Sequence, residues 1–432
     1  MARHIPNPST GGTTHQPPLG PPPAPPAGAP GRPGAAAFWL VGTVLVLLML
    51  SSSVPSALYV LYQDRWDLSS GMITVVFALY AVTVLAGLLV FGSLSDTLGR
   101  RPVLAAGLLL AIASMGLFAA AQGPVWLLAA RAVQGLAVGL ATGAMGAALL
   151  ELAPRSRPAL GAQVNSAGPT VGIGLGGIGA GLLVQYAPAP TSLSYLLLIG
   201  AFALCLAGVV RMPESAPGAV RSGGFRLTPH RIHVPAPARR RFAVLVLTII
   251  AVWSVGGFYL SLGPHLALSL LESTNYLAGG ATVALLAGAA TAAQLLLGRT
   301  EALRTAVLGL LGLLTGLGLV LLSLGLGSAA VFLAATAVLG SGWGAAFLGS
   351  FRALSGFADP SHRGELTAAV YVFAYLAMSV PAVLAGLFTN LHGLHRTSVG
   401  FMAAVAGVCA LALLVTVRLA ARTRAEAERG TA

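Results

Sequence analysis

Long, uninterrupted runs of apolar residues restrict this chain to one kind of architecture. Twelve runs, separated by short polar breaks, each hold about 20 residues or more, enough to cross a ~30 Å hydrocarbon core as a helix. They span 36–62, 71–95, 102–121, 125–150, 159–186, 193–212, 242–268, 275–298, 303–325, 329–351, 366–390 and 398–420. Because backbone groups in lipid must bond within their own segment, the runs predict an all-α integral membrane protein.

Charge is scarce and unevenly placed along the chain. Charged residues make up 8% of the sequence, about a third of the share in a soluble domain. The net charge of +13 includes 24 basic residues, all Arg. With the amino terminus in the cytoplasm, Arg65 and Arg396 fall in outer loops, Arg131 lies in the membrane, and the other 21 of the 24 lie inside. This asymmetry follows the positive-inside rule, so it predicts two cytoplasmic termini rather than a nucleic-acid partner.

Two breaks divide the chain into domains. Residues 1–35 are rich in Pro and Gly and predict a disordered cytoplasmic tail. Residues 213–241 are rich in Pro and Arg, and six apolar runs lie on each side of them, in 36–212 and 242–420. We therefore expect two six-helix bundles joined by a cytoplasmic linker, with residues 421–432 as a second tail. The linker arginines have two open interpretations, contact with anionic membrane lipid or topology signalling alone.

A charged motif follows the second run. It reads Gly92-Ser-Leu94-Ser-Asp96-Thr-Leu98-Gly99-Arg100-Arg101. The motif resembles the signature of the major facilitator superfamily between helices two and three, although Thr97 replaces the usual basic residue. The resemblance implies the major facilitator fold, monomeric transport of a small molecule by alternating access, and a location in the bacterial plasma (inner) membrane.

Within this motif the charges predict a cytoplasmic latch. A carboxylate is stabilised at a helix N-terminus, so Asp96 is expected to face the start of an opposing helix. Arg100 is expected to bridge Asp96 to Glu151 at the cytoplasmic end of the fourth run. In the family such contacts hold the outward-facing state closed. The alternative is that Arg100 and Arg101 only anchor the topology.

The fourth run carries a charge inside the membrane. Arg131 and Gln134 share one helix face and belong to the sequence Arg-Ala-Val-Gln-Gly. An intramembrane guanidinium is costly, so it is expected to face the protein interior and to have a function. Arg-x-x-Gln-Gly resembles a family motif linked to proton transfer, which implies a coupling role. The alternative is a structural Arg that bonds backbone carbonyls.

The fifth run carries a Gly-Pro motif. Pro169 removes a backbone hydrogen bond and predicts a kink, and Gly168 and Gly172 are small enough for close packing. Gly-Pro-x-x-Gly resembles the motif that marks antiporters in this superfamily. The resemblance therefore favours a proton-coupled antiporter of the drug-exporting, twelve-helix branch, with an uptake symporter or facilitator as the alternative.

Polar and aromatic side chains at the bundle interface are the candidates for lining a substrate pocket. They are Ser56, Tyr59, Gln163, Asn165, Tyr259, Gln294, Tyr371 and Tyr375. No Asp or Glu falls near the middle of a predicted span, and His265 is the membrane-adjacent side chain that titrates near neutral pH. These residues favour small amphipathic solutes over strong cations.

The remaining chemistry-bearing residues predict neither a metal site nor a cofactor. Cys205 and Cys409 lie in separate runs and read as buried apolar side chains. His392 and His395 flank an outer loop without a neighbouring acid, so a membrane-embedded enzyme is a remote alternative. A sensor or scaffold would need an appended soluble domain, and the first 35 residues are too simple in composition to form one.

Overall fold

The computed structural model describes residues 35–215, 239–357 and 363–430. Within these residues all regular structure is helical, and twelve helices are long and apolar enough to cross a membrane. The first six are α1 (Ala35–Trp66), α2 (Ser70–Phe91), α4 (Arg100–Ala119), α5 (Pro124–Glu151), α6 (Ala159–Tyr186) and α7 (Leu193–Arg211). The second six are α9 (Arg239–Ser261), α11 (Tyr276–Leu296), α12 (Ala302–Leu326), α13 (Ala329–Phe357), α14 (Arg363–His392) and α15 (Leu394–Gly430). Two short helices complete the fold: α3 (Leu94–Leu98) lies between α2 and α4 in the chain, and α10 (Gly263–Leu270) lies between α9 and α11.

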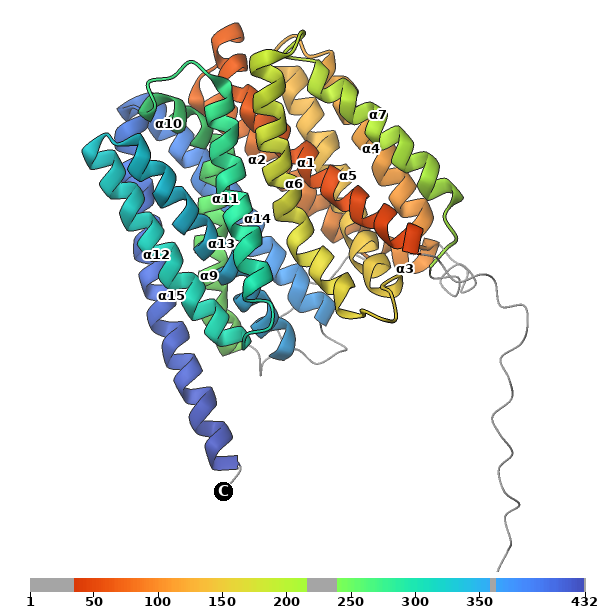
Figure 1. Cartoon of the computed structure of the whole chain (residues 1–432), viewed down its shortest axis with the longest axis vertical. Helices are drawn as coiled ribbons and strands as arrows, with labels where there is room; N and C mark the ends of the chain where they lie inside the picture. Colours follow the sequence, from red (N-terminus) through yellow and green to blue (C-terminus); the bar gives the residue numbers. More distant parts are fainter. Residues whose placement is uncertain (1–34, 216–238, 358–362, 431–432) are drawn as a thin grey trace, which may run out of the picture.

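The helices form two bundles that lie side by side (Figure 1). The first bundle, α1 to α7, buries a large apolar core, and the second, α9 to α15, is built around two smaller cores. The bundles meet where α6 packs along α11 and α2 packs along α14. Glycines allow the close approach at both seams, because a Cβ on Gly177 would lie 3.0 Å from the Gly280 carbonyl oxygen and one on Gly386 of α14 would lie 2.7 Å from Thr74 Cγ2 of α2.

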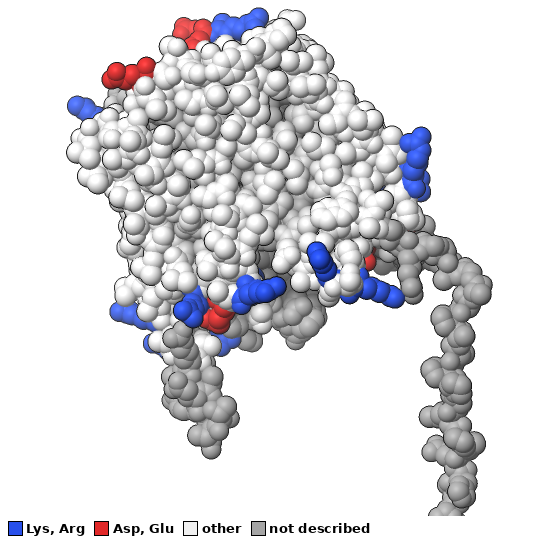
Figure 2. All heavy atoms as spheres, in the orientation of Figure 1, with Lys and Arg blue, Asp and Glu red and all other residues white. Residues whose placement is uncertain are grey.

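Charge is confined almost entirely to the two ends of the molecule. On the face drawn in Figure 2, a broad uncharged area separates the two ends, most basic side chains lie along the lower edge, and a further basic group lies on the right flank. We call the end where α4 begins and α5 finishes the basic end, and the opposite one, where α2 and α11 begin, the far end. The uncharged area is what a membrane-spanning surface requires.

Several boundaries differ from the sequence-based prediction, and three of the differences change the arrangement of helices. The seventh run, expected at 242–268, is broken at Leu262, because Pro264 lacks an N–H and starts α10 instead. The second span finishes at Phe91, and the motif after it forms the separate helix α3. The twelfth helix, expected at 398–420, continues as helix through most of the predicted 421–432 tail. Most of the predicted linker, 216–238, and residues 1–34 lie outside the described residues.

Candidate functional site

The guanidinium of Arg131 is enclosed between α5 and α1. The residue is 0% exposed. Its Nε and Nη2 donate to the Tyr59 hydroxyl at 3.0 and 2.6 Å, and its Nη1 donates to the Ser52 carbonyl at 3.0 Å and to Gln134 Oε1 at 2.7 Å. The rings of Tyr59, Tyr80 and Phe118 surround it, with centroids 5.5, 5.1 and 5.8 Å away. Neutral oxygens and aromatic faces therefore solvate this charge.

A proline in α1 explains why these donors are needed. Pro55 has no N–H, so the Ser51 carbonyl four residues earlier loses its helical partner. Gln134 Nε2 donates to that carbonyl at 2.9 Å, and Arg131 bonds the next one along. We call Arg131 and Gln134 the α1 clamp. The backbone-carbonyl contact that the sequence left open as an alternative is thus present.

The α1 clamp has no acidic partner in the part of the chain that the structure describes. Asp96 and Glu151 pair with Arg100 and not with Arg131, and the described Asp and Glu residues lie at helix ends or in loops. A guanidinium keeps its proton at physiological pH. The α1 clamp can therefore hold α1 and set the local field, but it cannot itself carry a proton.

Aromatic side chains gather where the second bundle faces the first. Trp253 of α9 lies 5.0 Å from Tyr375 and 6.5 Å from Tyr371, measured between ring centroids. Phe347 and Phe351 of α13 extend the group. These five residues are called the interface aromatics. Trp253 and Tyr371 also pack against the core of the first bundle, and Tyr375 is part of it, so the group lies at the bundle boundary.

The other residues predicted to line a pocket fall into three places. Gln163 and Asn165 are exposed on the basic-end half of α6. Gln294 is buried and accepts from Thr170 at 3.3 Å across the seam between the bundles. Three side chains lie inside a single bundle instead of facing a pocket: Ser56, Tyr59 and Tyr259. A buried phenol needs a partner, and Tyr259 finds it in Thr336 at 3.2 Å, just as Tyr59 finds Arg131.

The Gly-Pro motif packs α6 against α1. A Cβ on Gly172 would lie 2.7 Å from Met49 Cβ, and one on Gly168 would lie 2.9 Å from Leu45 Cδ2. Pro169 lies inside α6, next to Thr170, whose hydroxyl accepts from Thr291 at 2.8 Å. The motif therefore lies where α6 contacts both bundles at mid-depth.

A group of charges occupies the basic end of the first bundle. Arg100 contacts Asp96 at 2.5 Å and Glu151 at 3.1 Å, which is the predicted bridge. Asp96 itself is 62% exposed. At the N-terminus of α4 the carboxylate is instead that of Glu214, which accepts from the backbone N–H groups of Arg100 and Arg101 at 2.8 and 3.0 Å. All these residues come from one bundle.

Gly99 makes room for that carboxylate. Its φ is +94°, and an added Cβ would lie 2.6 Å from Glu214 Oε2. Replacing Gly99 by Ala is therefore expected to destabilise the protein by about 1–3 kcal/mol, through backbone strain and displacement of Glu214. Thermal unfolding in detergent measures this loss. Gly116→Ala in α4, the helix that Gly99 precedes, is the matched control, because nothing lies within 4 Å of its Cβ. Equal unfolding temperatures for the two variants would contradict the assignment.

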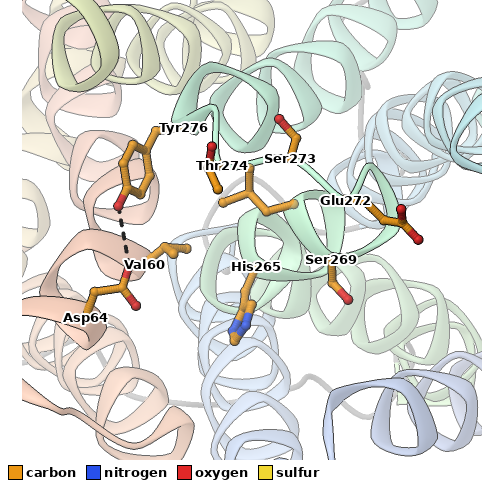
Figure 3. A pocket seen from close by; sticks show the side chains of 9 residues that line it. Val60, Asp64, His265, Ser269, Glu272, Ser273, Thr274 and Tyr276 are labelled. Atoms are coloured by element: carbon orange, nitrogen blue, oxygen red, sulfur yellow. Dashed lines mark hydrogen bonds between the residues drawn. The ribbon is translucent and has the colours of Figure 1, made fainter.

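A polar pocket lies at the far end (Figure 3). It has a volume of about 320 Å³, and its polar walls come from Asp64 of α1, His265 of α10, Tyr276 of α11 and the segment after α10. The Tyr276 hydroxyl donates to Asp64 Oδ2 at 3.3 Å. No partner for His265 is evident from the sequence, and the structure places it in one pocket with Asp64, a carboxylate of the first bundle.

Two six-helix bundles with a shared interface (Figure 1) are the arrangement that secondary transporters use for alternating access. The family model of the Major Facilitator Superfamily matches residues 39–380, and the chain belongs to this superfamily. The predicted family and the predicted fold, twelve helices in two bundles, are both confirmed.

Solved structures agree with the fold. A bacterial homolog of the human lysosomal transporter Spinster, in an inward-facing and occupied conformation, has a TM-score of 0.69 and 12% sequence identity, with 88% of this chain and 96% of that chain covered. Its inward-facing and unoccupied structure gives the same values. No curated protein matches the chain in sequence.

Proposed function

We propose that this transporter exports small amphipathic molecules in exchange for protons. The observation that carries the proposal is the group of interface aromatics at the bundle boundary, which suits an apolar body with few charges. The likeness of Gly168-Pro169-Thr-Val-Gly172 to the antiporter motif supports export. At 12% identity the Spinster homolog is evidence for the fold and not for the substrate.

The proposed orientation follows from charge. The basic end faces the cytoplasm under the positive-inside rule, so both termini are cytoplasmic and the far end faces outwards. We place the protein in the plasma membrane of a bacterial cell, as a monomer. In this orientation Gly92, Asp96, Gly99, Arg100, Arg101 and Glu151 form a cytoplasmic latch.

The α1 clamp is the proposed coupling element. Arg131 and Gln134 link the proline-containing part of α1 to α5, so bending of α1 during alternating access is transmitted to its neighbour. The exchanged proton then binds to a group other than Arg131, because the guanidinium keeps its proton at physiological pH.

Inside-out vesicles with a respiration-generated pH gradient test the proposal. Neutral, cationic and sugar-like solutes are added in turn, and a pH-sensitive dye reports proton release. Particular amphipathic solutes are expected to collapse the gradient, and Trp253→Leu is expected to reduce the response at least about tenfold through loss of a central aromatic anchor. Trp39→Leu is the matched control, since that residue is 55% exposed on the outer surface of α1. Equal losses in both variants would contradict a binding role for Trp253.

Uptake or facilitated diffusion is the second candidate. It is favoured by the position of the described carboxylates, which lie at helix ends or in loops rather than at mid-membrane. Counterflow of a radiolabelled solute that proceeds equally well with and without a pH gradient would favour this candidate over proton exchange.

A further inference from the structure

Hydrogen bonds cross the bundle boundary at the far end, and we call this arrangement the closed far end. The start of α11 is held by two helices of the first bundle: Tyr276 donates from its hydroxyl to Asp64 on α1 and from its backbone N–H to Gln185 on α6, at 3.3 and 2.9 Å. Asn275 Nδ2 donates to the Tyr186 hydroxyl at 3.2 Å. Opening the far end, as alternating access requires, breaks these bonds.

His265 lies beside this closure. Figure 3 shows Asp64 and Tyr276 pointing toward one another on one side of the pocket, with His265 between them and Glu272, which points away. Among the described residues, the charged and titratable groups that line this pocket with His265 are Asp64 from α1, Glu272 after α10 and Tyr276 from α11. Helix α9, which also packs on α10, has no Asp, Glu or His, and its three arginines, 239–241, lie at its opposite end.

The imidazole is placed to be neutral while the far end is closed. His265 Nδ1 is buried and has no hydrogen-bond partner among the described residues. A lone pair is tolerated there, but a proton would create a buried, charged and unpaired N–H. Burial accordingly lowers the pKa of His265 below its ordinary value of 6.5, and the Asp64 carboxylate offsets part of that effect.

We propose that His265 is a regulatory proton-binding site at which protonation opens the far end. An open far end exposes the imidazole to water and restores its ordinary proton affinity, so the open state binds the proton more tightly than the closed state. By linkage, the closed state loses stability relative to the open state as pH falls below about 6.5. The ratio of closed to open molecules then falls by up to about tenfold per pH unit. This inference requires alternating access but neither export nor a particular substrate.

Spin-label distances across the far end test the proposal in the full chain. Labels are placed on Gln122→Cys, in the loop between α4 and α5, and on Ala330→Cys at the start of α13, both exposed. The background carries Cys205→Ser and Cys409→Ser, because these are the chain's two cysteines. Lowering the pH from 7.5 to 5.5 in lipid nanodiscs is expected to increase the ratio of long to short distances about two- to tenfold.

Variants of the same pocket distinguish the contribution of His265 to the pH response from the contributions of its neighbours. His265→Gln is expected to leave the distance distribution unchanged between pH 7.5 and 5.5. Glu272→Gln, which removes the carboxylate that points away, is expected to retain the response. Asp64→Asn is expected to enlarge it, because the carboxylate that favours the buried imidazolium is gone. A response that persists in His265→Gln, or that is absent from the unmodified pocket, would overturn the proposal.

Discussion

Transport by Arg131→Met is expected to fall to the background of empty vesicles. Methionine fills much of the space but donates nothing, so the Ser52 carbonyl, the Tyr59 hydroxyl and Gln134 Oε1 lose their donor in a buried site. Each unsatisfied group costs about 1–3 kcal/mol. Arg131→Lys is expected to recover part of the loss, since its ammonium donates hydrogen bonds without reproducing the planar fork. Flux per correctly inserted molecule is the measurement.

A double-mutant cycle separates the α1 clamp from a general loss of stability. The Ser51 carbonyl is unpaired because position 55 is proline, so Pro55→Ala restores a helical N–H to it. Gln134→Leu is expected to cost about 1–3 kcal/mol of unfolding free energy in the native background and much less in Pro55→Ala, the difference being the coupling energy. Equal costs in both backgrounds would show that Gln134 does not serve the Pro55 kink.

Local length and charge made the fold predictable. The thickness of the hydrocarbon core sets the length of an apolar run, so each span could be read without knowing its neighbours. The bridge from Arg100 to Asp96 and Glu151 was also predictable, because the motif places Asp96 and Arg100 four residues apart and Glu151 follows the fourth run on the same side of the membrane. The break near Pro264 had a visible signal in the proline itself.

Contacts between distant parts of the chain were not predictable in the same way. Glu214 caps α4 from 114 residues away, and nothing in its local sequence points to the backbone of Arg100. Trp253 and Phe347 were missed because lipid-facing and buried positions are equally apolar in a membrane protein, so hydrophobicity does not identify the interface. Tyr259 was expected at the interface because it is a polar aromatic residue, but it lies in the core of the second bundle.

The close seam between α6 and α11 leads to the second large effect. A Cβ on Gly280 would clash with the Gly177 carbonyl oxygen and lie 3.1 Å from its carbon and 3.2 Å from Gly181 Cα, all of them backbone atoms that no rotamer change can move. Gly280→Val is therefore expected to separate the bundles at the far end, to favour the far-end-open state and to reduce transport.

The size of that effect follows from packing, and the same helix supplies the control. Overpacking costs about 1–3 kcal/mol, which corresponds to roughly a 5- to 150-fold shift between the closed and open populations. Gly288→Val in α11 meets nothing within 4 Å and is expected to transport like the unmodified protein. Solute flux and the distance between labels at Gln122→Cys and Ala330→Cys measure both consequences. If Gly280→Val and Gly288→Val gave the same flux and the same distances, close approach of α6 and α11 would not be needed for far-end closure.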